Sequence, residues 1–124
     1  LFPTPDVLAE ASFEGIGLTR ARIETLRGLS RAVADDASCL QPAGSLDDSL
    51  ARLQALPGIG AWTAHYIALR ALGEPDAFPA SDLGLARALA HGGKRPSPRE
   101  VATRAEGFRP FRAYATLRLW LQAP

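Results

Sequence analysis

The stretch that decides the fold reads L-P-G-I-G and occupies residues 56–60. Before it, leucines recur at intervals of three and four residues, which predicts an amphipathic helix over residues 45–55. After it, a second helix is predicted over residues 61–72. Gly58 and Gly60 permit positive φ angles and let the backbone approach another surface closely. The sequence therefore predicts two helices joined by a tight turn.

The rest of the chain is predicted to be helical as well. Ala, Leu and Arg dominate, and the alternating Val, Ile and Thr runs that are typical of strands are absent. Capping residues, prolines and glycines delimit further helices at residues 5–11, 19–34, 82–90, from Ser97 onward, and 110–122. We therefore predict an all-α fold, a helical bundle that forms one domain over residues 1–124.

Composition excludes several classes of protein. A chain of 124 residues supports one modest core, and no apolar run approaches the ~20 residues needed to cross a bilayer. The single cysteine, Cys39, cannot form an internal disulfide or a multi-cysteine metal site. His65 and His91 lack the spacing of metal ligands. We expect an intracellular protein, because a lone cysteine fits a reducing compartment.

Charge is distributed unevenly although the net charge is only +1. Residues 1–59 carry five Arg and eight Asp or Glu, whereas residues 60–124 carry eight Arg, one Lys and five Asp or Glu. The second half can face phosphates. Lys94, Arg95 and Arg99 either contact a phosphate backbone or face solvent, and charge alone favours the solvated surface.

The turn at residues 56–60 suits an anion. The free N–H groups at the start of the following helix point away from the turn, a geometry that favours a phosphate. Such binding carries no sequence information, because phosphates do not differ between bases. The alternative is a plain connection within a helical bundle.

Asp82 begins the helix predicted over residues 82–90. Asp is a favoured N-cap and often has no other role. Ser81 can also serve as the cap, which would leave Asp82 available for chemistry. Sequence spacing alone leaves both alternatives open.

Three stretches together resemble a known family. They read L-P-G-I-G-A-W-T-A-H-Y-I-A-L-R (56–70), D-A-F-P-A-S-D-L-G-L (76–85) and R-P-F-R-A-Y-A-T-L-R-L-W (109–120). In this order they resemble the 3-methyladenine DNA glycosylase II (AlkA-type) branch of the helix–hairpin–helix glycosylases. The segments F-P-T-P (2–5) and G-L-T-R-A-R (17–22) resemble the same branch, so the likeness spans nearly the whole chain.

The resemblance implies roles for particular residues. Asp82 matches the catalytic aspartate. The turn would hold a DNA phosphate through Gly58, Ile59, Gly60 and Thr63. An alkali-metal ion, Na or K, often accompanies this turn, and the backbone carbonyls of Gln54, Leu56 and Ile59 match its ligands; no cofactor is otherwise required.

The chemistry of the family calls for the residue types found here. Cleavage of a glycosidic bond builds positive charge on the sugar, which a desolvated carboxylate stabilises; the same group can orient or deprotonate water. A cationic, flipped-out base requires electron-rich aromatic faces. By resemblance these are Trp62, Tyr66 and Trp120, although aromatics at helical spacing are more often core residues.

Departures from related branches narrow the expected activity. Relatives that also cut the strand carry a lysine nucleophile where this chain has Trp62, so no Schiff base is expected. No cysteine follows Cys39, so the iron–sulfur cluster of some relatives is not expected. Leu83 occupies a position that is often aromatic in this branch, which bears on base preference. Arg112 and Tyr114 match the family motif, and we expect them to form a half-buried packing pair.

Helices that precede F-P-T-P in the family are not part of these 124 residues. We therefore expect the C-terminal portion of a larger glycosylase domain, with apolar surface that those helices would cover and weak DNA binding by this portion alone.

The sequence is compatible with three functions. The first is a monofunctional glycosylase that hydrolyses the N-glycosidic bond of alkylated bases in duplex DNA, as base excision repair requires. The second is a non-catalytic helix–hairpin–helix DNA-binding module, and the third is an all-α interaction domain. Asp82 and the aromatic residues favour the enzyme, for which we expect duplex DNA as partner, no membrane, and a bacterial cytoplasmic, nucleoid-associated location.

Overall fold

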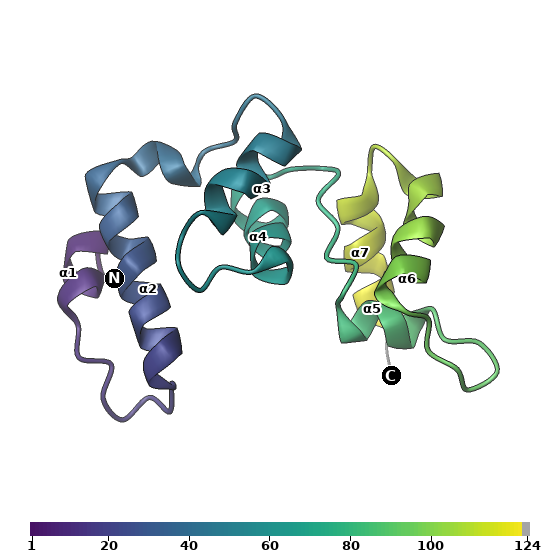
Figure 1. The fold of residues 1–124 in the computed structure, drawn as a ribbon, viewed down its shortest axis with the longest axis horizontal. Helices are drawn as coiled ribbons and strands as arrows, with labels where there is room; N and C mark the ends of the chain where they lie inside the picture. The colour runs from purple at the N-terminus through teal and green to yellow at the C-terminus, as the bar shows by residue number, and fades with distance from the viewer. Residues whose placement is uncertain (123–124) are drawn as a thin grey trace. The chain divides into compact units, whose positions relative to one another are not determined.

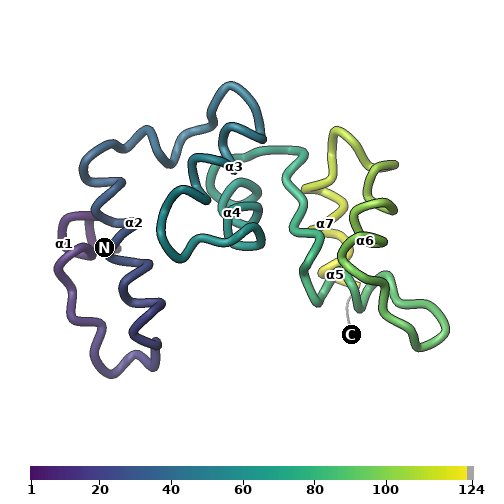
Figure 2. Tube along the Cα trace, viewed as in Figure 1, coloured from purple at the N-terminus to yellow at the C-terminus, as the bar shows by residue number. Residues whose placement is uncertain are grey.

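The computed structural model describes residues 1–122 and contains only helices and turns, apart from one isolated bridge pair (Figure 1). The all-α prediction is confirmed. No helix in the described residues is long and apolar enough to span a membrane. The chain divides into two compact units, Leu1–Gly60 and Ala61–Pro124. The trace in Figure 2 follows the order of the elements within each unit.

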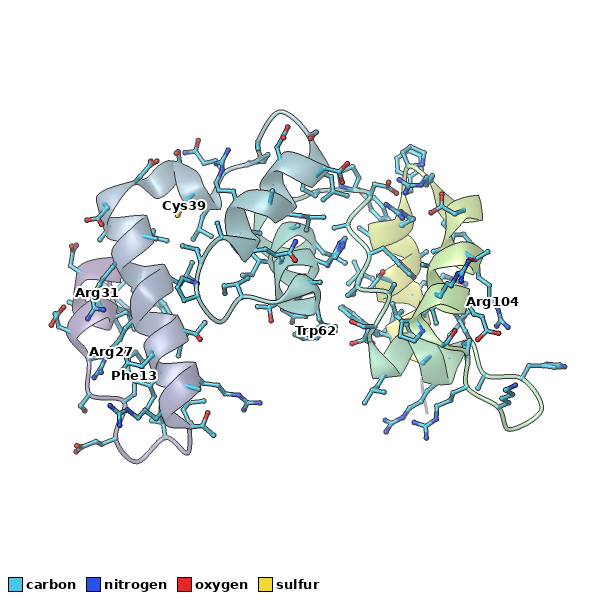
Figure 3. The ribbon with its side chains drawn as sticks, viewed as in Figure 1. Phe13, Arg27, Arg31, Cys39, Trp62 and Arg104 are labelled. Atoms are coloured by element: carbon cyan, nitrogen blue, oxygen red, sulfur yellow. The ribbon has the colours of Figure 1, made fainter. Side chains whose placement is uncertain are left out.

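The first unit contains α1 (Pro5–Glu10), α2 (Arg20–Asp35), the 3-10 turn η1 (Ala37–Leu40) and α3 (Leu46–Gln54). Thr19 caps α2 by accepting the Arg22 N–H at 3.4 Å. The guanidinium of Arg27, labelled in Figure 3, donates to the Ala11 carbonyl at 2.7 and 3.1 Å and thereby ties α2 to the end of α1. The η1 turn lies between the helices that the sequence predicted over residues 19–34 and 45–55.

The first unit ends in the glycine-containing turn. Ser45 caps α3 by accepting the Asp48 N–H at 3.1 Å, at the start of the helix that the sequence predicted over residues 45–55. After α3, the Ile59 N–H donates to the Leu56 carbonyl at 3.1 Å. Gly58 has a φ of +85°, and a Cβ there would lie 1.9 Å from Thr25 Oγ1. A glycine is therefore required both for the backbone angle and for the contact with α2.

The second unit contains α4 (Ala61–Ile67), η2 (Ala68–Leu72), α5 (Leu83–Ala88), α6 (Pro98–Ala105), the 3-10 turn η3 (Glu106–Phe108) and α7 (Arg112–Gln122). Its core is the buried cluster Phe78, Leu85, Val101 and Ala105, against which Trp120 packs. Ser97 and Glu100 form the complete capping box that starts α6. These contacts place the ends of α5 and α7 beside each other.

Three local predictions for the second unit are corrected. Residues 68–72 form a π-helical turn rather than the end of a regular α-helix, and Gly73 ends it at φ +70°. Pro110 does not open the last helix, because α7 begins two residues later, at Arg112. Arg112 does not pair with Tyr114: the guanidinium binds Asp76, while Tyr114 is 65% exposed and contacts Phe111 edge-on.

Candidate active site

Asp82 is the N-cap of α5. It has an extended backbone, and its Oδ1 accepts the Leu85 N–H at 2.9 Å. Among the contacts that hold the preceding loop, the Asp82 N–H donates to the Pro79 carbonyl at 2.8 Å, and the Phe78 N–H donates to His65 Nδ1 at 3.0 Å. Asp82, not Ser81, therefore provides the cap. His65 acts as a support for this loop, a role that its sequence position did not signal.

Two indole groups converge on the Asp82 carboxylate. Trp62 Nε1, from the first turn of α4, donates to Oδ2 at 2.8 Å. Trp120 Nε1, near the end of α7, donates to Oδ1 at 2.8 Å. Segments 20 and 38 residues away along the chain thus fix both oxygens of one half-buried acid.

The hydrogen bonds determine the ionisation of Asp82. Burial raises the pKa of its carboxyl group, but bonds from Trp120, the Leu85 and Gly84 N–H groups and Trp62 lower it more. The pKa of Asp82 therefore lies below its ordinary value. Every donor around the group favours the anion, because an N–H donates a hydrogen bond to a carboxylate and has no lone pair for a carboxylic acid proton.

An aromatic layer lies beside the carboxylate. The rings of Trp62 and Tyr66 stack with centroids 5.1 Å apart, as expected for residues four apart on one helix. Tyr66 and Trp120 follow at 5.9 Å with a tilt of 40°. Trp62 is 40% and Tyr66 37% exposed. These two aromatics are therefore not core residues, and they present ring surface to an incoming group.

Gly84 makes the approach of Trp120 to Asp82 feasible. A Cβ at this position would lie 2.9 Å from Asp82 Oδ1 and 3.1 Å from Trp120 Cδ1. Both distances are shorter than ordinary van der Waals contacts. A side chain here would therefore displace the carboxylate or the indole.

Two adjoining cavities flank the Asp82 loop. One, of about 210 Å³, includes Trp62, His65 and Pro79 in its walls. The other, of about 160 Å³, is lined by Asp82 itself together with Leu83, Arg95 and others. Ala80, Ser81 and Pro98 belong to both linings. Asp82 accordingly contributes to the wall of one of two open recesses whose linings are mainly apolar.

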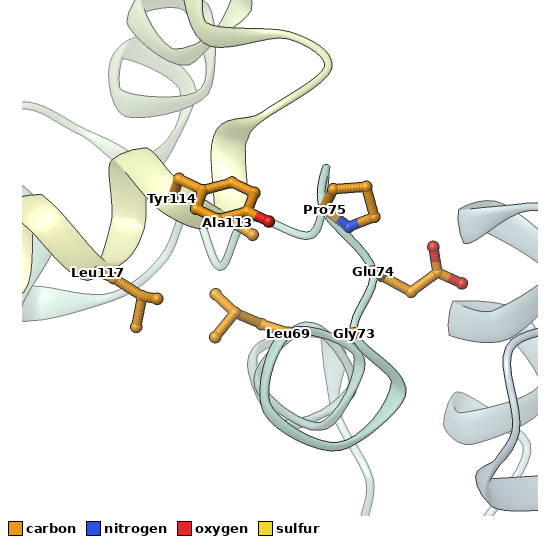
Figure 4. A pocket seen from close by; sticks show the side chains of 7 residues that line it. All are labelled: Leu69, Gly73, Glu74, Pro75, Ala113, Tyr114 and Leu117. Atoms are coloured by element: carbon orange, nitrogen blue, oxygen red, sulfur yellow. The ribbon is translucent and has the colours of Figure 1, made fainter.

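A further cavity, of about 150 Å³, lies apart from this chemistry. Its walls come from η2, the following loop and α7, with Leu69, Tyr114 and Leu117 as the main side chains (Figure 4). It contains none of the predicted site residues. Near it, the Ala113 N–H donates to the Pro75 carbonyl at 2.9 Å.

An ion-pair network fixes the start of α7. The guanidinium of Arg112 binds Asp76 with Nε–Oδ1 at 2.7 Å and Nη2–Oδ2 at 2.8 Å, and Arg109 binds the same carboxylate. Burial raises the pKa of Asp76, but the bonds and charges of Arg112 and Arg109 lower it below the ordinary value. Because Trp120 lies on the same helix as Arg112, the network orients an Asp82 donor from a distance. Arg112 was singled out by its match to the family motif, but no sequence signal predicted that its partner is Asp76.

The residues predicted to bind phosphate lie in and just after the turn. Gly58 and Gly60 are exposed, Thr63 is half-buried in α4, and Ile59 is only 6% exposed. The Ile59 N–H is already occupied by the Leu56 carbonyl. Ile59 therefore anchors the turn through its buried side chain. No cluster of three His, Cys, Asp or Glu side chains suited to a metal occurs in residues 1–122.

The chain is similar in sequence to known DNA repair proteins. No family model matches the chain. It is 40% identical over 119 residues to the "Probable bifunctional transcriptional activator/DNA repair enzyme AlkA" of Mycobacterium tuberculosis (strain CDC 1551 / Oshkosh). The aligned region covers 96% of this chain and 24% of that protein. The "DNA-3-methyladenine glycosylase 2" of Escherichia coli (strain K12) is 32% identical, with 96% of this chain and 42% of that protein covered. Nearly the whole chain is therefore similar in sequence to a part of each of these two proteins.

Solved structures of these glycosylases share the fold. The 3-methyladenine DNA glycosylase of Archaeoglobus fulgidus superposes with a TM-score of 0.81 at 31% identity, over 97% of this chain and 42% of the other. The Schizosaccharomyces pombe enzyme Mag1, solved in complex with abasic DNA, gives 0.79 at 27% identity, over 96% and 62%. The chain thus spans between 24% and 62% of the length of these four proteins and corresponds to a part of each.

Proposed function

We propose that this chain carries the catalytic part of a monofunctional DNA glycosylase that hydrolyses the N-glycosidic bond of alkylated bases, such as 3-methyladenine, in duplex DNA. The observation that supports this most directly is the Asp82 carboxylate, kept anionic by two indole N–H groups beside exposed aromatic rings. A module that only binds DNA needs neither feature.

The aromatic layer supplies the base-binding element of the proposal. A base inside a duplex must be flipped out before its sugar carbon can be attacked. Alkylated purines are cationic, and the π-faces of Trp62 and Tyr66 attract cations. Trp120 contributes mainly through its hydrogen bond to Asp82, because it is more buried than the other two.

Asp82 stabilises the positive charge that develops on the sugar. As the base leaves, the sugar approaches an oxocarbenium ion, and a fixed anion in a partly desolvated recess lowers the energy of that state. The lowered pKa of Asp82 makes it a weak proton acceptor. We therefore assign it an electrostatic role first, with orientation of the attacking water as its second task.

The turn at residues 56–60 is proposed to hold a DNA phosphate. Gly58 provides the backbone angle of the turn, Gly60 leaves its backbone open because a Cβ there would meet nothing within 4 Å, and Thr63 offers a hydroxyl. The carbonyls of Gln54, Leu56 and Ile59 suit Na⁺ or K⁺, because neutral oxygens prefer hard cations. The Leu56 carbonyl accepts one hydrogen bond and retains a lone pair for such an ion. We propose a cytoplasmic, DNA-associated location for a protein with this partner.

Base release from methylated duplex DNA tests the proposal. Asp82→Asn should lower single-turnover release by at least about 100-fold, the usual cost of removing an electrostatic catalytic group. Asp36→Asn is the matched control, because Asp36 also caps a helical turn, through the Ser38 N–H at 2.9 Å, but contacts no indole. Equal release by both variants would contradict the assignment. Duplex binding by the unaltered protein with no release would favour the non-catalytic module.

A further inference from the structure

Most acids of the second unit are locally engaged, which leaves several cations uncompensated. Asp76 and Glu106 are paired with Arg109 and Arg112. Asp82 accepts indole N–H groups. The excess positive charge of this half of the sequence therefore remains on other residues, two of which, Lys94 and Arg95, lie in the connection between α5 and α6.

That connection is a short, fixed hairpin. The His91 and Lys94 backbones exchange two hydrogen bonds of 3.1 Å, and Gly92 and Gly93 make the turn with φ angles of +57° and +77°. The hairpin positions Lys94 and the next residue, Arg95. Within the described residues, Arg95 makes no hydrogen bond or ion pair.

Three cations from this region surround one hollow. A cavity of about 230 Å³ is lined by Lys94, Arg95 and Arg104, with His91, Pro96 and Glu100 completing its walls. We call this cavity, with its three cations Lys94, Arg95 and Arg104, the basic hollow. Arg104, on α6, is labelled in Figure 3. Arg104 donates to the Leu89 carbonyl, a neutral acceptor, at 2.8 Å. Glu100 accepts from Ser97 and also interacts with the charges of Lys94 and Arg104, so it offsets one of the three positive charges. The hollow therefore keeps a net charge of about +2.

Arg95 links the basic hollow to the candidate active site. It lines both this hollow and the 160 Å³ cavity that Asp82 borders, as does Pro96. If Asp82 faces the sugar of a flipped nucleotide, the phosphates attached to that sugar lie within a few bonds of it and pass close to the residues that line the cavities beside Asp82. Arg95 is the cation in that lining.

We propose that the basic hollow is a second DNA-phosphate site, which holds the strand that enters or leaves the Asp82 cavity. This inference rests on the proposed function, since it takes Asp82 to face the sugar. The planar guanidinium of Arg95 suits two oxygens of a single phosphate, while Lys94 acts as a point charge. The contact is independent of sequence, because it involves only the backbone.

The salt dependence of DNA binding tests the proposal without requiring catalysis. The probe is a duplex with a stable abasic-site analogue, titrated between about 50 and about 200 mM salt. Each phosphate contact contributes about 0.9 to the slope of log affinity against log salt. The double variant Lys94→Gln/Arg95→Gln should therefore bind more weakly, with a slope smaller by about 1 to 2.

Controls separate a specific site from general charge. Arg70→Gln/Arg118→Gln removes equal charge from two exposed arginines of the same unit that line neither cavity; its slope should change by less than half as much. Arg95→Lys in the Lys94→Gln background should restore part of the slope. Equal slopes for the two double variants, or an unchanged slope for Lys94→Gln/Arg95→Gln, would overturn the proposal.

The outcomes also separate this site from the glycosylase proposal. DNA binding with a reduced slope but no base release by the unaltered protein would contradict the enzyme while supporting the phosphate site. Normal base release by the unaltered protein, together with an unchanged salt slope in Lys94→Gln/Arg95→Gln, would support the enzyme and contradict the phosphate site. A protein that does not bind the duplex would overturn both.

Discussion

Replacing Gly84 by alanine should disable the site while leaving the fold intact. The new Cβ would lie 2.9 Å from Asp82 Oδ1 and 3.1 Å from Trp120 Cδ1, about 0.5 Å inside ordinary contact distances. The carboxylate is held by three N–H groups and the indole by core packing, so neither moves without losing a bond. A displacement of this size exceeds the tolerance of catalytic geometry and should reduce base release by about 10- to 100-fold.

The cost to stability should be much smaller. Overpacking destabilises by about 1–3 kcal/mol, but alanine is favoured over glycine in a helix by about 1 kcal/mol, so the net loss is about 0–2 kcal/mol. Gly28→Ala in α2 is the matched control, because a Cβ there meets nothing within 4 Å. It should raise stability slightly and leave base release unchanged.

Indole spectroscopy makes this test specific to the site. Trp62 and Trp120 are the two tryptophans of the chain, and both N–H groups bind Asp82. In Gly84→Ala, the indole N–H resonance of Trp120 should shift more than that of Trp62, because two of the three atoms nearest to the new methyl group belong to Trp120 and none belongs to Trp62. Wild-type rates of base release together with unshifted indole resonances would refute the reasoning.

Three further perturbations address other parts of the molecule. Because the pKa of Asp82 is lowered, its contribution to stability is present above the unfolded pKa and is lost as pH falls through the lower, folded value. The rate of base release should therefore stay constant from neutral pH to below about pH 3.9, the ordinary pKa of an Asp carboxyl group. A rate that already falls with decreasing pH above this value would contradict the prediction. Asp76→Asn leaves Arg112 with Glu106 as its remaining acid partner and should lower the free energy of unfolding by about 2–4 kcal/mol, measured by denaturant titration. A loss under about 0.5 kcal/mol would show that the Arg112–Asp76 pair contributes no more than a solvent-exposed ion pair. Gly58→Ala meets both an unfavourable φ and Thr25, so it should cost about 2–4 kcal/mol, and Thr25→Gly in the same chain should recover part of this loss in melting measurements; no recovery would mean that the contact with α2 is not the cause.

The sequence predicted the helices well where local chemistry decides them. Thr19, Ser45 and Ser97 each accept the N–H group that their spacing from the helix start required. The errors lie at helix ends and in one irregular turn. The π-helical turn at 68–72 follows no local signal, and Phe111 belongs to the turn before α7, since its N–H donates back to the Phe108 carbonyl at 2.7 Å.

The candidate site was predictable as a set of residue types but not as a geometry. Spacing on one helix gave the Trp62–Tyr66 pair, since residues four apart share a face. The bond from Trp120 joins segments 38 residues apart, and only the tertiary fold sets such a contact. For the same reason the need for Gly84 and the support from His65 were not visible in the sequence.

Asp82 serves stability and the proposed chemistry with the same two oxygens, and this determines what its substitution tests. Oδ1 accepts from Leu85 and Trp120, while Oδ2 accepts from Trp62. Asparagine keeps one acceptor oxygen, so it can still cap α5, but its NH₂ group would face an indole N–H. The variant therefore loses the negative charge and orphans one indole while it retains the cap. An activity loss with a nearly unchanged melting temperature would thus locate the effect in the charge and its two aromatic donors, whereas Asp82→Ala would mix it with a capping loss of about 1 kcal/mol.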